Sequence, residues 1–255
     1  MPLPVPSSDP ILYTQKNKAS AISGMAVNSS SALAMILTGD GKLFSVVGLS
    51  LYVSLSGTLF ACLAGMPFGA LVGLTRFPGR TGLIVLLNGC MGLPPVVIGL
   101  LVYLLLSRSG PLGSFGILFT PRAMIIAQAV LITPIIAALT RQVIEDLWAE
   151  YRDELTAMAV GPSSRVRVLL WDARFSLVTI ALAGFGRAAA EVGAVMIVGG
   201  NIDGFTRVMT TSIALETSKG DLPLAIALGA VLIGVVLAVN ALAWALRDWS
   251  EHHAG

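Results

Sequence analysis

The sequence has few charged residues, few histidines and few cysteines for its length. Only 12% of its 255 residues are charged, whereas a soluble domain carries about 25%. The two histidines stand together near the C-terminal end, and no group of His, Cys and carboxylate residues has the spacing of a zinc site. Cys62 and Cys90 both lie inside apolar runs, which excludes a secreted-type disulfide framework. These shortages argue against a soluble globular protein and against a metal site.

Sequences that bind nucleotides or nucleic acids are missing as well. Lys42 follows Gly41, but the first glycine of a Gly-x-x-x-x-Gly-Lys-Ser/Thr phosphate-binding loop is lacking. Lys and Arg number 16 against 14 Asp and Glu, so the net charge of +2 leaves no basic face for nucleic acid. No Ser or Cys stands beside a plausible base for nucleophilic catalysis. We therefore expect no catalytic residue and no cofactor in this chain.

Apolar sequence is what the chain has in abundance. Hydrophobic residues make up 55% of it, and the mean hydropathy is +0.85. A helix needs about 20 apolar residues to cross a bilayer core, and its backbone groups are satisfied within the segment, as hydrocarbon requires. We predict an all-α membrane protein with about five transmembrane helices, over residues 44–74, 82–107, 123–139, 175–198 and 222–246.

Several prolines fall inside these runs. Pro67, Pro94, Pro95 and Pro134 each predict a kink, which membrane helices tolerate. Pro223 stands at the start of the last run, a position that suits proline. The prolines therefore do not contradict the helical assignment.

Polar segments flank the apolar part of the chain. Residues 1–42 are rich in proline and serine and lack the pattern of a signal peptide. We predict a polar N-terminal tail with a short interfacial helix over residues 32–37, and a sixth span over residues 21–38 is the alternative. Residues 43–247 form the predicted transmembrane domain, and residues 248–255 form a C-terminal tail.

The distribution of Lys and Arg predicts the orientation, since cytoplasmic loops carry an excess of positive charge. One alternating set of loops, which includes the 141–174 segment and the C-terminus, holds eight of these residues. The opposite loops hold four and the N-terminal tail holds three. This difference predicts a cytoplasmic 141–174 loop, a cytoplasmic C-terminus and an N-terminus outside.

The 141–174 loop carries its own helical pattern. We expect the first helix to stop at Gly161 in a left-handed cap and the next to start at Pro162, so that two helices meet at a corner. Such a corner is either a rigid docking element for a partner or an amphipathic loop resting on the membrane surface. The apolar stripe comprises Ile144, Leu147, Trp148, Tyr151, Leu155 and Met158.

The segment from Asp153 to Gly161 resembles the EAA loop of ABC importer permeases. It departs from that motif at Leu155, which replaces an acidic residue, and at Thr156, which replaces the first alanine. The Leu-Pro pair that usually follows is absent around residues 171–174. The resemblance implies that this corner contacts an ATPase. The implied coupling residues are Glu154, Ala157, Gly161, Pro162 and Arg165.

Longer segments resemble permease subunits of tungstate importers, and molybdate and sulfate permeases share a looser version. These segments are residues 110–128, 186–202, 206–211 and 215–220. The resemblance implies a type I, molybdate-permease-like fold. It also implies the pore subunit of an ATP-driven oxyanion importer, with tungstate as the expected substrate and molybdate or sulfate as alternatives.

The same resemblance implies an assembly. A homodimer of the permease would work by alternating access with two cytoplasmic ATPase subunits, which hold the ATP and Mg, and an extracytoplasmic oxyanion-binding protein. The expected location is the inner membrane of a bacterial or archaeal cell. A self-contained secondary transporter is the rival interpretation, but it would usually show two inverted repeats, and none is evident.

Two charged residues, Arg187 and Glu191, fall in the middle of the fourth predicted span. Their spacing of four residues puts them on one helical face, where they can pair. An ionised group at the bilayer centre costs about 2.5–3.5 kcal/mol, so both should face protein or water. They either line the translocation pathway or only fix helix packing. The small residues around them, such as Gly184, Gly186 and Gly193, favour a dimer seam or gate.

Other polar residues are predicted to serve contacts. Asn88 and Gln128 lie inside spans, and we expect each to hydrogen-bond a neighbouring helix. The loop over residues 199–220 is long enough to meet a binding protein, and the alternative is a solvated connector. The candidate contacts in this loop are Asn201, Arg207 and Thr210.

Overall fold

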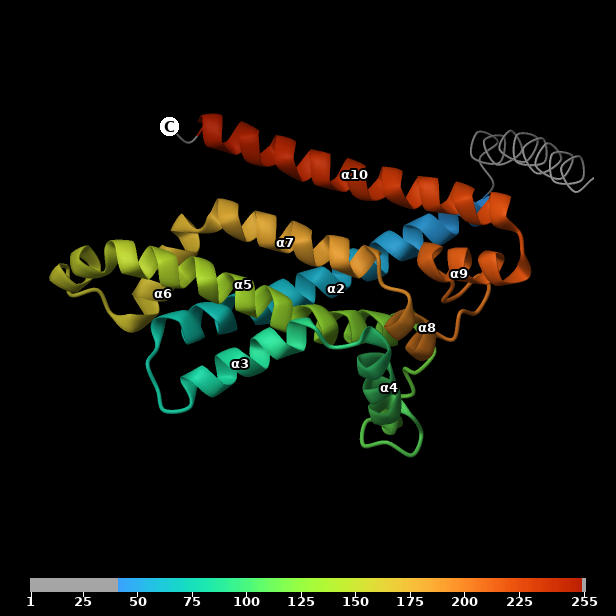
Figure 1. Ribbon diagram of the computed structural model, residues 1–255, viewed down its shortest axis with the longest axis horizontal. Helices are drawn as coiled ribbons and strands as arrows, with labels where there is room; N and C mark the ends of the chain where they lie inside the picture. Colours follow the sequence, from blue (N-terminus) through green and yellow to red (C-terminus); the bar gives the residue numbers. More distant parts are fainter. Residues whose placement is uncertain (1–40, 254–255) are drawn as a thin grey trace, which may run out of the picture.

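The computed structural model describes residues 41–253, and within this range every regular element is a helix (Figure 1). The predicted interfacial helix over residues 32–37 and the alternative span over 21–38 lie outside the described residues. The elements are α2 (Gly41–Leu74), α3 (Arg80–Met91), α4 (Pro95–Leu106), the 3₁₀ turn η1 (Gly113–Phe115), α5 (Pro121–Ala157), α6 (Pro162–Asp172), α7 (Arg174–Ala189), α8 (Gly193–Gly199), α9 (Met209–Lys219) and α10 (Leu222–His253).

Three described helices are long and apolar enough to cross a membrane, and the number rises to five if each of two bent helix pairs is one span. The three are Leu43–Leu74, Pro121–Ala157 and Leu222–Ala245. They match the first, third and fifth predicted spans. The all-helical membrane architecture predicted from composition is therefore confirmed.

The second and fourth predicted spans differ from the sequence prediction. Residues 82–107 were expected to form one kinked helix, but α3 and α4 meet at 103°. Two successive prolines explain this bend: Pro95 starts α4, and Pro94 is extended, with ψ at 124°, because a residue before proline is pushed out of the helical region. The fourth span is also interrupted, since α7 ends at Ala189 and α8 starts at Gly193.

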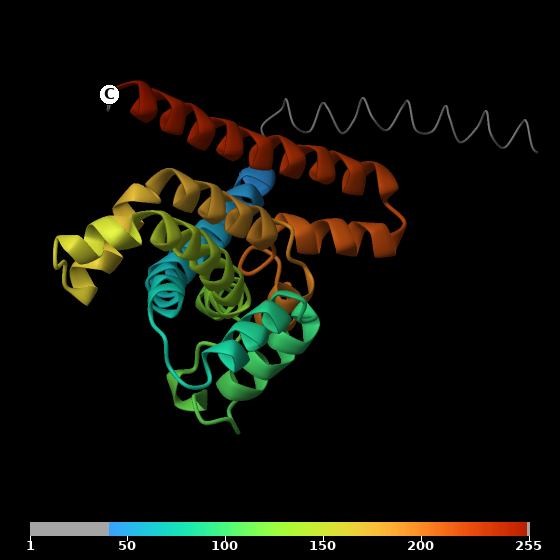
Figure 2. The same cartoon turned by 60° about the vertical axis from the view of Figure 1, so that its left-hand side comes forward.

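The central feature of the fold is the packing of α2 along α5 (Figures 1 and 2). A Cβ atom added to Gly69 would lie 2.3 Å from the carbonyl oxygen of Ala137, and one added to Gly65 would lie 2.9 Å from that of Thr133. Only glycine allows two backbones to come so close. The residues of α2 at this seam recur every fourth position: Gly57, Ala61, Gly65, Gly69 and Gly73.

The seam also sets the chain topology. Gly57 meets Gln128, and Gly73 meets the backbone of Arg141, so α2 and α5 run parallel. Parallel neighbours need a connection that returns to the starting side, and α3 with α4 provides it. The bent pair is therefore one passage across the bundle, although it is no straight helix.

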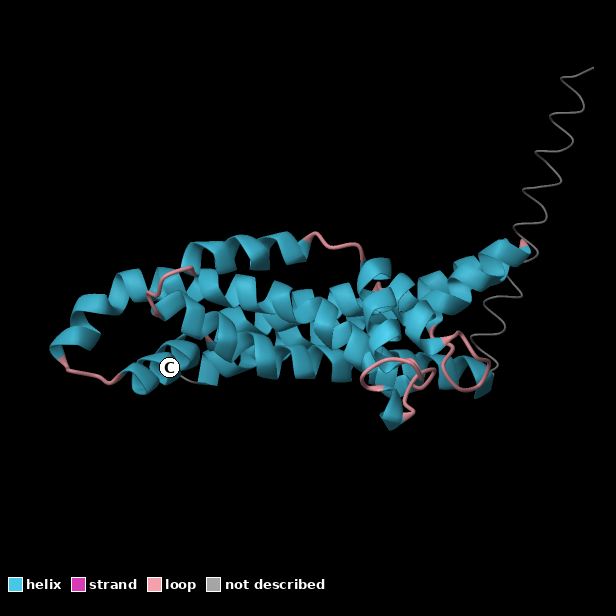
Figure 3. Cartoon of the chain, turned by 90° about the horizontal axis from the view of Figure 1, so that it is seen from below, coloured by secondary structure: helices cyan, strands magenta, loops and turns pink. Residues whose placement is uncertain are grey.

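The two ends of the bundle carry different elements. The C-terminal end of α10 lies at the same end as α6, whereas the start of α2 lies at the other end, beside α9 (Figures 1 and 3). Among the described contacts, α10 packs on α9 and α7. Much of its surface is apolar and exposed, including Ile233 at 62% and Leu237 at 63%. This helix faces lipid or another subunit.

The seam yields a stability prediction. In Gly69→Ala, the added methyl group overlaps the Ala137 carbonyl, so the helices must separate, and we expect a loss of about 1–3 kcal/mol of folding free energy. Gly48→Ala is the matched control, because nothing lies within 4 Å of a Cβ at Gly48 in the same helix. Thermal unfolding of both variants in detergent measures the difference. Equal stability of the two variants would contradict the close approach.

Candidate functional site

Charged and polar side chains meet at the break between α7 and α8. Arg187 lies in the last turn of α7 and Glu191 lies just after it. The Arg187 Nη1 atom is 2.7 Å from Glu191 Oε2, so the pairing predicted from their spacing is present. The prediction of one continuous helix through both residues is wrong, because the backbone leaves the helix between them.

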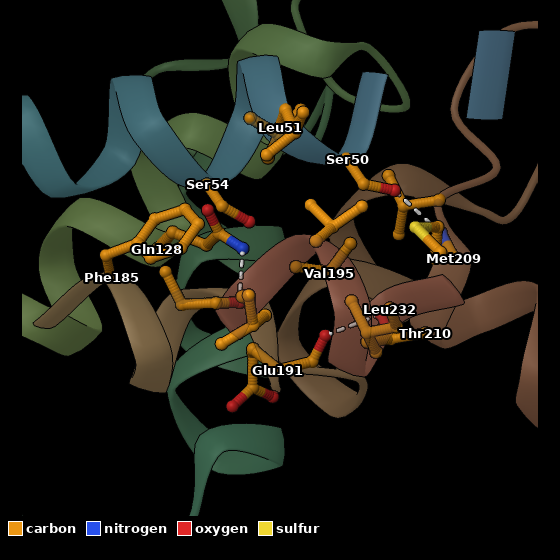
Figure 4. A pocket seen from close by; sticks show the side chains of 16 residues that line it. Ser50, Leu51, Ser54, Gln128, Phe185, Glu191, Val195, Met209, Thr210 and Leu232 are labelled. Carbon is orange, nitrogen blue, oxygen red and sulfur yellow. Dashed lines mark hydrogen bonds between the residues drawn. The ribbon is translucent and has the colours of Figure 1, made fainter. Parts of the chain in front are cut away.

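Glu191 organises this break through three contacts. One carboxylate oxygen pairs with Arg187, and the other accepts a hydrogen bond of 3.1 Å from the backbone N–H of Ala194 in the first turn of α8. The Thr210 hydroxyl, on α9, donates to the Glu191 carbonyl oxygen at 2.8 Å (Figure 4). Glu191 is only 3% exposed. Glu191 therefore caps α8, accepts a hydrogen bond from α9 and neutralises the charge of Arg187.

Gln128 of α5 supports the other side of the break. Its Nε2 atom donates to the Ala188 carbonyl oxygen at 3.0 Å (Figure 4), which confirms the predicted bond to a neighbouring helix. Asn88, by contrast, is exposed, and no hydrogen bond of its side chain is recorded in the described part of the chain. Gln128, Glu191 and Thr210 line a narrow pocket. Polar groups from α5, α7 and α9 thus meet inside the bundle.

Arg187 reaches the outside of the described chain, since 34% of its side chain is exposed. Next to it, nothing lies within 4 Å of a Cβ built on Gly186, and Ala183 and Ala190 are also exposed. This face of α7 is open and lined by small residues. A charge here needs an aqueous or protein neighbour in the membrane.

Two of the small residues expected at a dimer seam pack inside the chain instead. A Cβ on Gly184 would meet Ile136 at 3.1 Å, and one on Gly193 would meet Val96 at 2.6 Å. These glycines allow α5 and α4 to approach α7 and α8. The open face of α7 is the part that stays available to a second subunit.

The loop after α8 places its three candidate contacts differently. Arg207 pairs with the exposed Asp203 at 2.8 Å, and Asn201 is partly exposed with a left-handed backbone at φ 50°. Both lie partly exposed in the loop between α8 and α9. Thr210 does not, because it is 7% exposed and bound to Glu191. The sequence could not show that this hydroxyl is used inside the fold.

The second candidate site is the corner between α5 and α6. Pro162 is the first residue of α6, as predicted. Gly161, however, is extended, with φ at −67°, and the left-handed residue is Ala159, with φ at 52°. The α5 helix ends earlier than the glycine, at Ala157, so the left-handed turn falls two residues before Gly161. The predicted cap at Gly161 is therefore wrong, although the corner itself exists.

The corner is a packed unit. Leu155 and Leu169 are buried in a common cluster that continues to Ile144. The Arg165 guanidinium lies 5.3 Å from the centre of the Trp148 ring, and its Nε donates to the Val160 carbonyl oxygen at 2.7 Å. Arg165 thus links the turn to α5, and both of these contacts lie within the corner. The end of α5 and α6 are therefore packed against each other through side-chain contacts.

The outer face of the corner is a groove between the last turns of α5 and α6, with about 1710 Å³ of empty space. Glu154 lies at its edge and Met158, 73% exposed, stands beside it. Ala157 is also exposed. The lining is mostly apolar, and its charged residues are Glu154, Arg167 and Asp172.

An ion cluster that the sequence analysis did not identify connects the corner to the bundle. Glu145 of α5 bridges Arg141 on its own helix and Arg80 at the start of α3. The Arg80 Nε also donates to the Val72 carbonyl oxygen of α2 at 3.0 Å. Arg141 starts the charged half of α5, so this cluster joins three helices where the apolar sequence ends. The i,i+4 spacing of Arg141 and Glu145 was the available signal.

The comparisons with known proteins decide the family. The chain is 42% identical to a probable anion ABC transporter permease protein of Haloferax volcanii over 81% of this chain and 91% of that protein. It is 38% identical to a tungstate uptake system permease protein of Peptoclostridium acidaminophilum, over 85% of this chain and 95% of that protein. The chain belongs to the family of ABC transporter permeases. No family model matches it.

More distant permeases agree with this assignment. The tungstate uptake system permease protein of Campylobacter jejuni is 35% identical over 82% of this chain and 87% of that protein. A sulfate transport system permease protein of Salmonella typhimurium is 29% identical over 71% of this chain and 70% of that protein. As an ABC permease, the chain is a multi-pass membrane protein.

The backbone at the corner predicts that Ala159, and not Gly161, is the position sensitive to a β-branched residue. Ala159→Val puts a β-branched residue at φ 52°, which costs roughly 1–2 kcal/mol and shifts the turn. Gly161→Val should be tolerated, because φ at −67° suits any residue. Protease sensitivity of the 155–165 segment and thermal stability measure both effects. Greater damage from Gly161→Val would contradict this geometry.

Proposed function

We propose that this chain is the membrane-spanning pore subunit of an ATP-driven tungstate importer. The observation that carries the proposal is the 38% and 35% identity to two tungstate uptake permeases over more than four fifths of the chain. The sulfate permeases are more distant. A permease for molybdate or sulfate is the alternative substrate assignment.

The corner groove supports an ATPase as the partner on one side of the membrane. The α5 helix has 37 residues, about 55 Å at 1.5 Å per residue, which exceeds the bilayer core by about 25 Å. Its charged half therefore projects from the membrane and carries the corner with it. We propose that this end is cytoplasmic, together with the C-terminus, and that the α9 end faces outward.

Arg187 and Glu191 support a role in transport. Their break joins α7, α8 and α9, and Arg187 reaches the open face of α7. We propose that two copies of the chain meet near this face and enclose the pathway. A partly neutralised arginine attracts an oxyanion without trapping it. ATP and Mg act on the partner ATPase, and this chain needs no cofactor.

Transport itself tests the proposal. The permease, its ATPase and its binding protein are reconstituted in liposomes, and uptake of radiolabelled tungstate is measured with and without ATP. We expect ATP-dependent uptake that excess tungstate abolishes and excess sulfate leaves largely intact. Uptake without ATP would favour a secondary transporter, and equal competition by sulfate would refute the tungstate assignment.

Docking of the ATPase is tested at Met158. Met158→Glu places a charge in the corner groove, where the side chain is exposed, so folding should persist while binding of the ATPase weakens by about 2 kcal/mol, or roughly 30-fold. Ser164→Glu is the control, since Ser164 lies exposed in the first turn of α6 and does not line the groove. Co-purification and titration of ATPase with each permease variant give the affinities. Unchanged affinity in Met158→Glu would place the interface elsewhere.

The pathway role is tested with variants that keep the α8 cap. Glu191→Gln retains an oxygen for the Ala194 N–H but removes the charge that pairs with Arg187, which should cost about 1–3 kcal/mol and lower uptake. Arg187→Met combined with Glu191→Gln should restore stability without restoring uptake. Glu216→Gln, which breaks the surface pair with Lys219, should change stability by less than about 1 kcal/mol. Normal coupled uptake in the double variant would show a purely structural pair.

A further inference from the structure

A long apolar groove runs between α10 and the bundle. Its walls come from α2, from α7 with the end of α6, and from α10, and it contains about 1270 Å³ of empty space. Leu59 and Cys62 line it on α2, Leu182 on α7 and Val239 on α10. The groove shares Leu170 with the corner groove and Phe185 with the pocket at the α7–α8 break, and its other lining residues belong to neither.

The dimensions of the groove match one leaflet of a membrane. Along α7 the lining extends from Arg174 to Phe185, which is about 17 Å at 1.5 Å per residue. Along α2 it extends from Leu55 to Met66, an equal number of residues. Half of a 30 Å hydrocarbon core is about 15 Å. The groove is therefore as long as the acyl layer of one leaflet.

Charge occurs at one end of the groove. Among the described lining residues, Arg174 is the one with a charge, and no described residue forms an ion pair with it. Its Nη1 donates to the Trp171 carbonyl oxygen at 3.1 Å. The other guanidinium nitrogens have no recorded hydrogen bond within residues 41–253. An anion can bind there without displacing a carboxylate.

Aromatic rings hold this arginine at the depth of lipid headgroups. The Arg174 guanidinium lies 4.5 Å from the centre of the Phe175 ring and 5.4 Å from that of Trp171. Trp171 is 73% exposed at the bend where α7 begins. Exposed Trp and Arg at the end of a span are typical of the membrane–water interface.

We propose that this groove binds one anionic phospholipid, with the phosphate on Arg174 and an acyl chain between α7, α2 and α10. The position of the cation at one end, the apolar walls and the leaflet-sized length all fit this occupant. A helix from a second copy of the chain could cover the apolar walls, but that helix would have to place an acidic residue next to Arg174 to balance its charge. The lipid would hold α10 against the bundle.

The headgroup contact is tested by native mass spectrometry. The permease assembled with its partners is purified from nanodiscs that contain phosphatidylglycerol and phosphatidylcholine in equal amounts. We expect phosphatidylglycerol to be retained preferentially, and its affinity to fall roughly fivefold in Arg174→Gln. Arg152→Gln, at an exposed arginine of α5 outside the groove, is the matched control. Equal retention in wild type and Arg174→Gln, or an equal loss in Arg152→Gln, would overturn the proposal.

The acyl contact is tested from within the groove. Cys62 is labelled with a fluorophore in a Cys90→Ser background, and chain-brominated phosphatidylglycerol should quench it more strongly than brominated phosphatidylcholine. Ala181→Phe fills the groove from α7 and should abolish this difference, and Ala243→Phe does the same from α10 if the first variant fails to fold. Quenching that is equal for both lipids overturns the proposal. Protection of Cys62 from maleimide that persists after lipid removal also overturns the proposal, because a second copy of the chain then fills the groove.

Discussion

Close contact between the backbones of α2 and α5 is the interaction on which the rest of the structure depends. Lipid tails are as apolar as leucine, so burial of apolar side chains does not by itself drive membrane helices together. Close van der Waals packing has to do so, and the seam at Gly65 and Gly69 permits it. Because the two helices run parallel, α3 and α4 must return across the bundle between them. The bend at Pro94 and Pro95 fits that passage.

The seam also gives α5 its mechanical position. Fixed against α2 along its apolar half, the helix projects about 25 Å beyond the bilayer core and carries the corner as a rigid extension. Glu145 ties it to Arg80 and Arg141 where it leaves the apolar region. Through these contacts α5 is connected to α3 and, by the hydrogen bond from Arg80 to Val72, to α2. The same bundle leaves α10 on its outside, where lipid can reach the groove beside Arg174.

Sequence reasoning succeeded where the signal was local or compositional. It identified the long apolar helices, the pairing of Arg187 with Glu191 and the start of α6 at Pro162. It was wrong about Gly161, because the chain turned left-handed earlier, at Ala159. It missed the glycine seam, although a small residue at every fourth position of α2 was a readable pattern. It also treated Thr210 as a surface contact, since nothing in the sequence shows that this hydroxyl binds Glu191.

The sequence by itself determined that this chain is a helical membrane protein and that Gln128, Arg187 and Glu191 lie within its apolar segments. Hydrophobicity and i,i+4 spacing are properties of single segments, and they do not depend on neighbours. The tertiary structure alone decided which helices are broken, which glycines pack within the chain and which face of α7 stays open around Arg187. These outcomes depend on distances between segments far apart in the chain. Glu191 shows the difference: its charge could be read from the sequence, but its capping of α8 and its bond from α9 exist only because the fold brings three helices to one point.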